Sequence, residues 1–176
     1  MKPFQIQSTN NAIGINNANY NIIEVDVSTL GNKQALQPGT KTPIKNTKGV
    51  YIFISEKDFP KFNINYFNSE VTGIFFKQNR PYVKEVGVPP FIETPQEDCI
   101  FYVGRADKVI SRIKEHWNND KINGCKSLKL GFTSRKWIKK FLKVYVITSC
   151  VDGGKKLDNK QLEKDIRAEW GSAFGE

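Results

Sequence analysis

The chain has few residues of the kinds that build covalent or metal-bound frameworks. Its 176 residues include three cysteines, one histidine and one methionine. Cys99, Cys125 and Cys150 are odd in number and widely spaced, so they form neither a disulfide framework nor a zinc-binding pattern. A reducing, cytoplasmic setting is the expectation that follows.

Long apolar runs are also absent. A membrane-spanning helix needs about 18 or more consecutive apolar residues, and the sequence contains no such run. The N-terminus begins Met1-Lys2-Pro3-Phe4 and has no apolar segment of the signal-peptide type. We therefore expect no membrane partner and no secretory signal. Twelve Phe and three Trp supply large side chains for the core of one domain, or of one domain with an extension.

The basic residues are concentrated in one part of the chain. Between Arg105 and Lys143 there are twelve Lys or Arg and three acids, so these 39 residues carry +9. The rest of the chain has fifteen basic and fifteen acidic groups, which cancel. A localised excess of this kind is typical of a surface that binds a polyanion, first of all DNA, with RNA as an alternative. A solvated basic surface without a ligand is the plainer interpretation.

Apolar periodicity predicts an alternation of strands and helices. Residues 1–20 are rich in Asn and predict a loosely ordered arm, and residues 31–47 predict a loop. Leu128, Leu130 and Phe132 alternate with other residues and indicate an extended segment. The predicted strands are 21–30, 49–55, 99–104 and 143–148, and the predicted helices are 107–118, 134–142 and 158–170.

Three helical faces and two caps can be identified. Val109, Ile113 and Trp117 form an apolar stripe on the first helix, with Arg112 and His116 one turn apart on a neighbouring face. Ser134 and Asp158 are the expected N-caps of the second and third helices. The inward-facing residues of these two helices are Trp137, Ile138 and Phe141, and then Leu162, Ile166 and Trp170.

Residues 56–98 separate the two most strand-like segments. They contain five of the eight prolines, so we interpret them as an insertion that carries a hairpin, with strands near 71–77 and 82–86. The expected fold class is α+β: a small, mainly antiparallel sheet that includes 49–55, 99–104 and 143–148, flanked by helices. An N-terminal extension, 1–47, with a strand of its own, precedes the domain 48–176.

Short motifs on these elements resemble a known family. Gly49-Val50-Tyr51 and Tyr102-Val103-Gly104 resemble the two half-motifs that name the GIY-YIG nucleases. Arg112 and His116 on the following helix are similar to the family's catalytic Arg and to the His found four residues later. Glu163, followed by an aliphatic residue at Ile166, resembles the family's metal-binding Glu. The resemblance covers roughly residues 47–55 and 99–175.

The resemblance implies a metal-dependent endonuclease that hydrolyses DNA phosphodiester bonds by a one-metal mechanism. It also implies a GIY-YIG-like fold for the domain. Its cofactor would be Mg²⁺ or Mn²⁺, held by Glu163. The implied catalytic residues are Tyr51, Tyr102, Arg112, His116 and Glu163.

The chemistry of these side chains agrees with that implication. A single carboxylate suits a hard cation that keeps most of its water, and Arg112 can donate two parallel hydrogen bonds to a phosphate. Tyr51 is expected to act as the general base or in the chain that removes a proton from water, with its pKa lowered by Arg112 and the metal. His116 titrates in the range needed to accept that proton, and Tyr102 is expected to position the water or a phosphate oxygen.

Each residue also has a plainer interpretation. The tyrosines could be ordinary sheet aromatics, Arg112 and His116 a solvated pair, and Glu163 a partner of Arg167 at i, i+4. The chain departs from the family in its long insertion and in having no Asn after Glu163, where Ser172 could substitute.

We expect the basic segment between Arg105 and Lys143 to contact the phosphates of the nucleic acid. A restriction-like or defence nuclease is the favoured role, and a structure-specific repair or recombination nuclease is its alternative within the family. A non-catalytic nucleic-acid-binding module and an interaction protein with an acidic partner are rivals from other classes. A homodimer is compatible with the sequence. The expected nucleic-acid contacts are Arg105, Lys108, Lys126, Lys129, Arg135, Lys136, Lys139 and Lys140.

Overall fold

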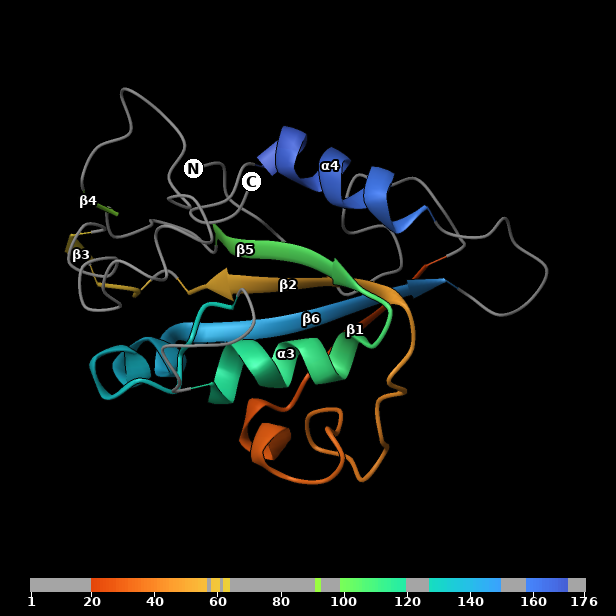
Figure 1. The fold of residues 1–176 in the computed structure, drawn as a ribbon, viewed down its shortest axis with the longest axis horizontal. Helices are drawn as coiled ribbons and strands as arrows, with labels where there is room; N and C mark the ends of the chain where they lie inside the picture. The colour runs from red at the N-terminus through yellow and green to blue at the C-terminus, as the bar shows by residue number, and fades with distance from the viewer. Residues whose placement is uncertain are drawn as a thin grey trace.

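Four antiparallel strands form the central sheet of the computed structural model, which describes residues 20–56, 58–60, 62–63, 91–92, 99–119, 127–149 and 158–170 (Figure 1). The strands are β1 (Tyr20–Glu24), β2 (Gly49–Ser55), β5 (Cys99–Ala106) and β6 (Leu142–Ser149), in the order β1-β6-β2-β5. Every residue of β2 is buried because β2 has a strand on each side and is covered on both faces. Its β-branched and aromatic residues suit such a position.

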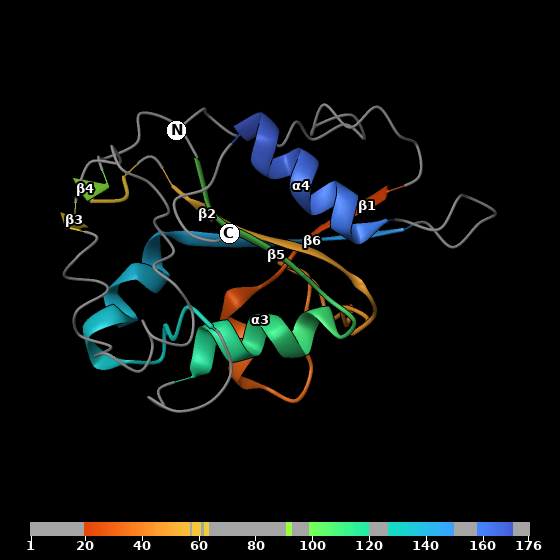
Figure 2. The same ribbon diagram turned by 45° about the horizontal axis from the view of Figure 1, so that its top comes forward.

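Helices cover both faces of the sheet. On one face lies α4 (Asn159–Trp170), whose Leu162 and Ile166 pack against apolar residues of β2, β5 and β6. On the other face lie α3 (Val109–Asn118) and two 3₁₀ helices, η1 (Val27–Gly31) and η2 (Thr133–Phe141). Figures 1 and 2 show α4 on one side of the sheet and α3 with η1 on the other.

The expected α+β class with a small antiparallel sheet is therefore confirmed, and so are most of the predicted elements. Strand 49–55 is β2, strand 99–104 is extended to Ala106 in β5, and strand 143–148 lies within β6. The stripe of Val109, Ile113 and Trp117 is buried as predicted. Asp158 caps α4 by accepting hydrogen bonds from the N–H groups of Lys160 and Gln161.

Three local predictions were wrong. Leu128, Leu130 and Phe132 lie in coil and turn and not in an extended segment, and Lys129 among them has φ 51°. The strand expected over 21–30 ends at Glu24, because Asp26 accepts hydrogen bonds from the N–H and the hydroxyl of Ser28 and begins η1. The helix expected over 134–142 begins at Thr133, so Ser134 lies inside η2 and not at its N-cap position. Phe132 stands at its N-cap position without a side-chain hydrogen bond.

The described part of the predicted N-terminal extension packs into the same core as the sheet. Val25, Leu30 and Ile44 are buried in the cluster that also contains Tyr51 and Ile113. The loop predicted over 31–47 is confirmed, apart from Gly31, which ends η1, and one isolated bridge. This segment therefore takes part in building the α3 face of the sheet.

Asn46 ties that loop to the start of α3. Its side-chain oxygen accepts hydrogen bonds from the N–H groups of Ile110 and Ser111, and the carbonyl of Thr47 accepts from Val109 N–H. The first turn of a helix has N–H groups that no residue of the helix itself can satisfy. Here a residue that precedes the helix by more than sixty positions in the sequence satisfies them.

The ends of the predicted insertion come together in a short ladder. β3 (Phe62–Asn63) pairs antiparallel with β4 (Phe91–Ile92). The arm 1–19, the strands expected near 71–77 and 82–86, and Ser172 lie outside the described residues. Among the helices that the structure describes, none has the length and apolar character needed to cross a membrane.

Candidate active site

The glycines of the two half-motifs both stand where a side chain would collide with a neighbour. A Cβ at Gly49 would lie 2.7 Å from the carbonyl oxygen of Ile147 on β6. A Cβ at Gly104 would lie 2.5 Å from the hydroxyl oxygen of Tyr51, its partner across the β2–β5 ladder. The residue type at Gly104 therefore decides whether the Tyr51 hydroxyl has room on the α3 face of the sheet.

The Tyr51 hydroxyl meets His116 from α3. Its oxygen lies 2.9 Å from Nε2 of His116, and both side chains are buried. Tyr102 joins them, with its ring centroid 4.9 Å from that of His116 and 6.0 Å from that of Tyr51. Phe53, which faces Tyr102 across the ladder, closes the group. We call Tyr51, Phe53, Tyr102 and His116 the aromatic cluster.

His116 is fixed by the segment that follows α3. Its Nδ1 accepts a hydrogen bond from Leu128 N–H at 2.8 Å, and its carbonyl accepts one from Leu130 N–H at 2.9 Å. Burial, together with the charge of Arg112, lowers the pKa of His116 well below its ordinary value. The ring is therefore neutral at physiological pH, and the prediction that His116 titrates in the physiological range was wrong.

Arg112 lies beside the aromatic cluster and reaches the surface. Its Nη1 donates to Glu115 at 2.6 Å, and its side chain is 22% exposed. The positive charge of its guanidinium acts to lower the pKa of both Tyr51 and Tyr102. The interpretation of Arg112 and His116 as a solvated pair is excluded, because His116 is buried.

Burial outweighs Arg112 in setting the ionisation of the two tyrosines. Desolvation is the largest effect on each of them, and it raises the pKa of both above the ordinary value of a tyrosine. The predicted lowering of the Tyr51 pKa by Arg112 is therefore present, but the effect of burial is larger than that of Arg112. Tyr51, which is 1% exposed, is a neutral hydroxyl in this structure at physiological pH.

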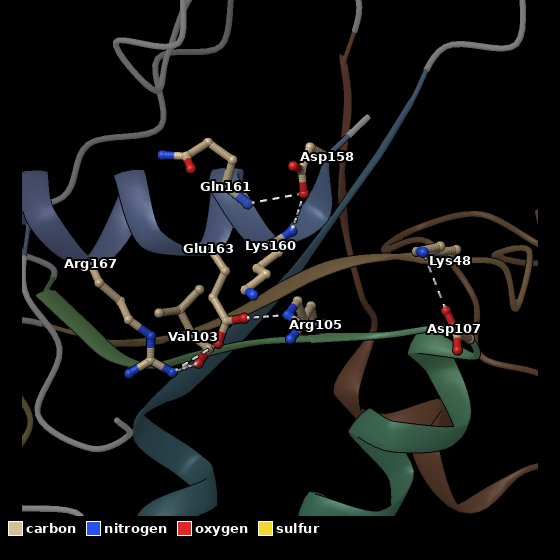
Figure 3. A network of polar contacts seen from close by, with 9 residues as sticks. All are labelled: Lys48, Val103, Arg105, Asp107, Asp158, Lys160, Gln161, Glu163 and Arg167. Atoms are coloured by element: carbon tan, nitrogen blue, oxygen red, sulfur yellow. Dashed lines mark hydrogen bonds and ion pairs between the residues drawn. The ribbon is translucent and has the colours of Figure 1, made fainter. Parts of the chain in front are cut away.

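Glu163 lies on α4, on the other face of the sheet. One carboxylate oxygen is 3.0 Å from Nε of Arg105, and the other is 3.0 Å from Nη2 of Arg167. Arg167 also donates to the carbonyl oxygen of Val103 at 2.6 Å. Figure 3 shows Glu163 and Arg167 pointing from α4 toward β5, where Arg105 meets the carboxylate. We call Arg105, Glu163 and Arg167 the ion-pair cluster.

The two clusters are separate in their contacts but not in their electrostatics. Four of the five predicted catalytic residues (Tyr51, Tyr102, Arg112 and His116) come together on the α3 face. Glu163 stays with its arginines, yet its charge raises the pKa of Tyr102 and that of Arg167 lowers it. The charges of the ion-pair cluster therefore act on Tyr102, although its ring belongs to the aromatic cluster.

A divalent cation at Glu163 would need a change in these contacts. Within the described ranges, no three His, Cys, Asp or Glu side chains gather where they could hold a metal ion. Mg²⁺ is often bound through one or two carboxylates while it keeps several waters, so Glu163 alone is chemically suitable. Both of its oxygens, however, face guanidinium groups. The site fits a hard cation only when Arg105, which is 48% exposed, has moved away.

Two of the expected nucleic-acid contacts are buried, so assigning them to the surface was wrong. Lys129 and Arg135 are each 1% exposed, and Arg135 donates through Nη1 to the carbonyl of Leu128 at 2.7 Å. The role of Arg135 is therefore to hold the segment behind His116. Lys126 lies outside the described residues.

The remaining lysines are available at the surface. Lys108, Lys136 and Lys140 are exposed, and Lys139 is half-buried with its ammonium 5.2 Å from the ring centre of Trp117. Desolvation and the neighbouring Lys136 lower the pKa of Lys139. Lys136, Lys139 and Lys140 all lie on η2, which makes η2 the basic element on the α3 face.

Four residues that take part in these contacts were not identified from the sequence as site residues: Phe53, Glu115, Leu128 and Arg167. Glu115 and Arg167 are spaced three and four residues from their partners on a helix, and that spacing is a usable signal. Leu128 has no such signal, because it acts through its backbone N–H.

Comparison with protein-family models, curated proteins and solved structures finds no match to this chain.

Proposed function

We propose that this protein is an endonuclease of the GIY-YIG type that hydrolyses DNA phosphodiester bonds with Mg²⁺ or Mn²⁺ as cofactor. The observation that carries the proposal is the meeting of Tyr51, Tyr102, Arg112 and His116 in one group, in which Tyr51 and His116 share a hydrogen bond and Gly104 leaves room for the Tyr51 hydroxyl. An ordinary sheet core has no need of a buried His–Tyr pair beside a partly exposed arginine. A restriction-like or defence role is favoured.

Exposure assigns different tasks to the residues of this group. Arg112 and Tyr102, which are 22% and 9% exposed, are the ones that can contact a phosphate. Arg112 would exchange its bond to Glu115 for phosphate oxygens and stabilise the extra negative charge of the transition state. Tyr51 and His116 are buried, so they would orient Tyr102 and Arg112.

Glu163 is the described carboxylate that would hold the cation. A bound Mg²⁺ or Mn²⁺ supplies positive charge to the phosphate and the leaving oxygen. Arg105 is the partner able to release Glu163, because it is half-exposed and would itself gain a phosphate contact. Arg167 is held in place by the carbonyl of Val103.

The direct test is cleavage of supercoiled plasmid DNA by the purified protein with Mg²⁺ or Mn²⁺, with and without EDTA. Glu163→Ala should abolish cleavage and leave DNA binding largely intact, because it removes a negative charge from beside the phosphate. Arg112→Ala should lower both, with a loss in rate of roughly 10²- to 10³-fold. Glu169→Ala removes the same charge from an exposed position of α4 and serves as the control. Full cleavage by Glu163→Ala would overturn the role of Glu163.

The exposed lysines of η2 are tested by binding. Reversing the charge of Lys136 and Lys140 together should weaken binding to every DNA sequence about equally and flatten its dependence on salt. Lys164→Glu on α4 changes the charge on the opposite face and is the matched control. Unchanged binding in the double variant would assign η2 to solvated surface.

A non-catalytic nucleic-acid-binding module is the second candidate, and one observation favours it. Both oxygens of Glu163 are engaged by arginines, as expected of a residue that stabilises the fold rather than binding a metal. Salt-dependent DNA binding without cleavage in either metal would support this alternative over the nuclease.

A further inference from the structure

The two ring nitrogens of His116 have different partners, and together these partners determine where the ring carries its proton. Nδ1 lies 2.8 Å from the backbone nitrogen of Leu128, whose N–H donates to it. A nitrogen that accepts a hydrogen bond must offer a lone pair, so Nδ1 carries no hydrogen. The single hydrogen of the neutral ring is then on Nε2, which lies 2.9 Å from the Tyr51 hydroxyl oxygen.

We propose that His116 is a fixed hydrogen-bond donor to the Tyr51 hydroxyl and that the backbone of Leu128 holds it in this tautomer. His116 is then a positioning residue for Tyr51. It is not the acceptor of the Tyr51 proton, because Nε2 already holds a proton of its own. The tautomer itself stands on the geometry alone, whereas its consequence for catalysis rests on the proposed nuclease function.

The segment behind His116 holds the Leu128 peptide at both ends. Its N–H is bonded to His116, and its carbonyl accepts from Nη1 of the buried Arg135 at 2.7 Å. Leu130 N–H donates to the carbonyl of the same histidine at 2.9 Å. Two N–H groups on alternate residues can reach one histidine because Lys129 between them has φ 51°, in the left-handed region. Such a backbone conformation is uncommon outside glycine and persists only when its surroundings determine it.

The proposal also determines the direction of the Tyr51 O–H. A hydroxyl oxygen can accept two hydrogen bonds and donate one. His116 Nε2–H takes one of the acceptor positions, so the Tyr51 O–H is directed away from His116. The rings of Tyr51 and Tyr102 lie with their centroids 6.0 Å apart. Tyr102, the less deeply buried of the two tyrosines, lies beside the Tyr51 ring. A continuous series of hydrogen bonds runs from the Leu128 backbone through His116 to the Tyr51 hydroxyl.

The tautomer can be measured directly, because His116 is the only histidine of the chain. Labelling with ¹⁵N-histidine gives one ring spectrum, in which a protonated and an unprotonated nitrogen resonate far apart. The expected result is a hydrogen on Nε2 and none on Nδ1 in the folded protein at neutral pH. A hydrogen on Nδ1, or a doubly protonated ring, would overturn the proposal whether or not the protein cleaves DNA.

Two substitutions test the consequence. His116→Gln replaces the Nε2 donor with an amide N–H, and the amide cannot take up a proton at neutral pH. His116→Phe keeps an aromatic ring in the cluster and removes both nitrogens. If His116 only donates, His116→Gln should retain kcat within about tenfold of the parent, while His116→Phe should lose about 10²- to 10³-fold, the range typical of a lost proton-handling or hydrogen-bonding group.

The two measurements separate failure of the inference from failure of the function. If His116→Gln loses as much kcat as His116→Phe while its thermal unfolding matches the parent, His116 has a proton-transfer role and the donor assignment is overturned. If the parent protein cleaves no DNA, the proposed function fails, and the ¹⁵N spectrum alone then supports or overturns the tautomer.

Discussion

The aromatic cluster and the ion-pair cluster occupy opposite faces of the same pair of strands and are held by different forces. In the aromatic cluster, Tyr51 and His116 are fully buried and joined by a hydrogen bond that bulk water does not reach. In the ion-pair cluster, Arg105, Glu163 and Arg167 are between 18% and 48% exposed. A buried hydrogen bond is costly to break, whereas a partly exposed ion pair contributes little to stability. The first cluster is therefore a rigid support, and the second is able to exchange its partners.

The largest expected loss of stability, and the strongest test of this comparison, is at Gly104. Gly104→Ala places a Cβ 2.5 Å from the Tyr51 hydroxyl, which is buried and held by its hydrogen bond to His116. Overpacking of this kind should lower the free energy of unfolding by about 3 kcal/mol. Gly31→Ala is the control, because nothing lies within 4 Å of its Cβ position. Denaturant unfolding measures both, and equal stability of the two variants would mean that the Tyr51 hydroxyl is not confined.

An intermediate effect should appear at mildly acidic pH. The pKa of His116 is depressed in the folded protein, so below its ordinary value of 6.5 the unfolded chain binds a proton that the folded chain does not. Stability should fall as pH decreases below 6.5, by up to about 1.4 kcal/mol per pH unit. The titratable or charged groups that face the ring are Tyr51, Tyr102 and Arg112, and none of them changes its charge near this pH.

The measurement is the unfolding free energy between pH 7 and pH 5, with His116→Gln as the matched variant. The variant should lose the part of the slope that comes from the histidine and keep the part that comes from carboxylates. Identical slopes in the two proteins would show that His116 is as easily protonated in the folded state as in the unfolded state.

The smallest effect is expected in the ion-pair cluster. Arg105→Ala should change the free energy of unfolding by less than about 1 kcal/mol, because the pair is partly exposed and solvent screens it. Arg167→Ala should lower the free energy of unfolding more than Arg105→Ala does, since Arg167 also donates to the Val103 carbonyl.

Arg105→Ala should in addition strengthen the binding of Mn²⁺ in the absence of DNA, measured by electron paramagnetic resonance. Weaker Mn²⁺ binding would contradict the idea that Arg105 competes with the metal for Glu163.

Local sequence was sufficient for much of the fold. The β-branched and aromatic run at 49–55, the stripe of Val109, Ile113 and Trp117, and the Asp158 cap all depend on residues close together in the chain. Prediction from local sequence failed where another local interaction was stronger. Asp26 caps η1, so the predicted strand 21–30 ends early. The cap of α3 could not be predicted from nearby residues, because it is supplied by Asn46. In the sequence, Asn46 is separated from α3 by β2, the insertion and β5.

The candidate site divides in the same way. The sequence by itself determined which residue types are present and which helical partners stand a turn apart, including Arg112 with His116 and Glu163 with Arg167. Only the tertiary structure decided their states. Burial depends on everything packed around a group, so it made His116 neutral and raised the pKa of Tyr51 despite the adjacent Arg112. The distribution of basic residues along the chain likewise could not reveal that Lys129 and Arg135 point inward, because charge in a sequence has no direction until the chain has folded.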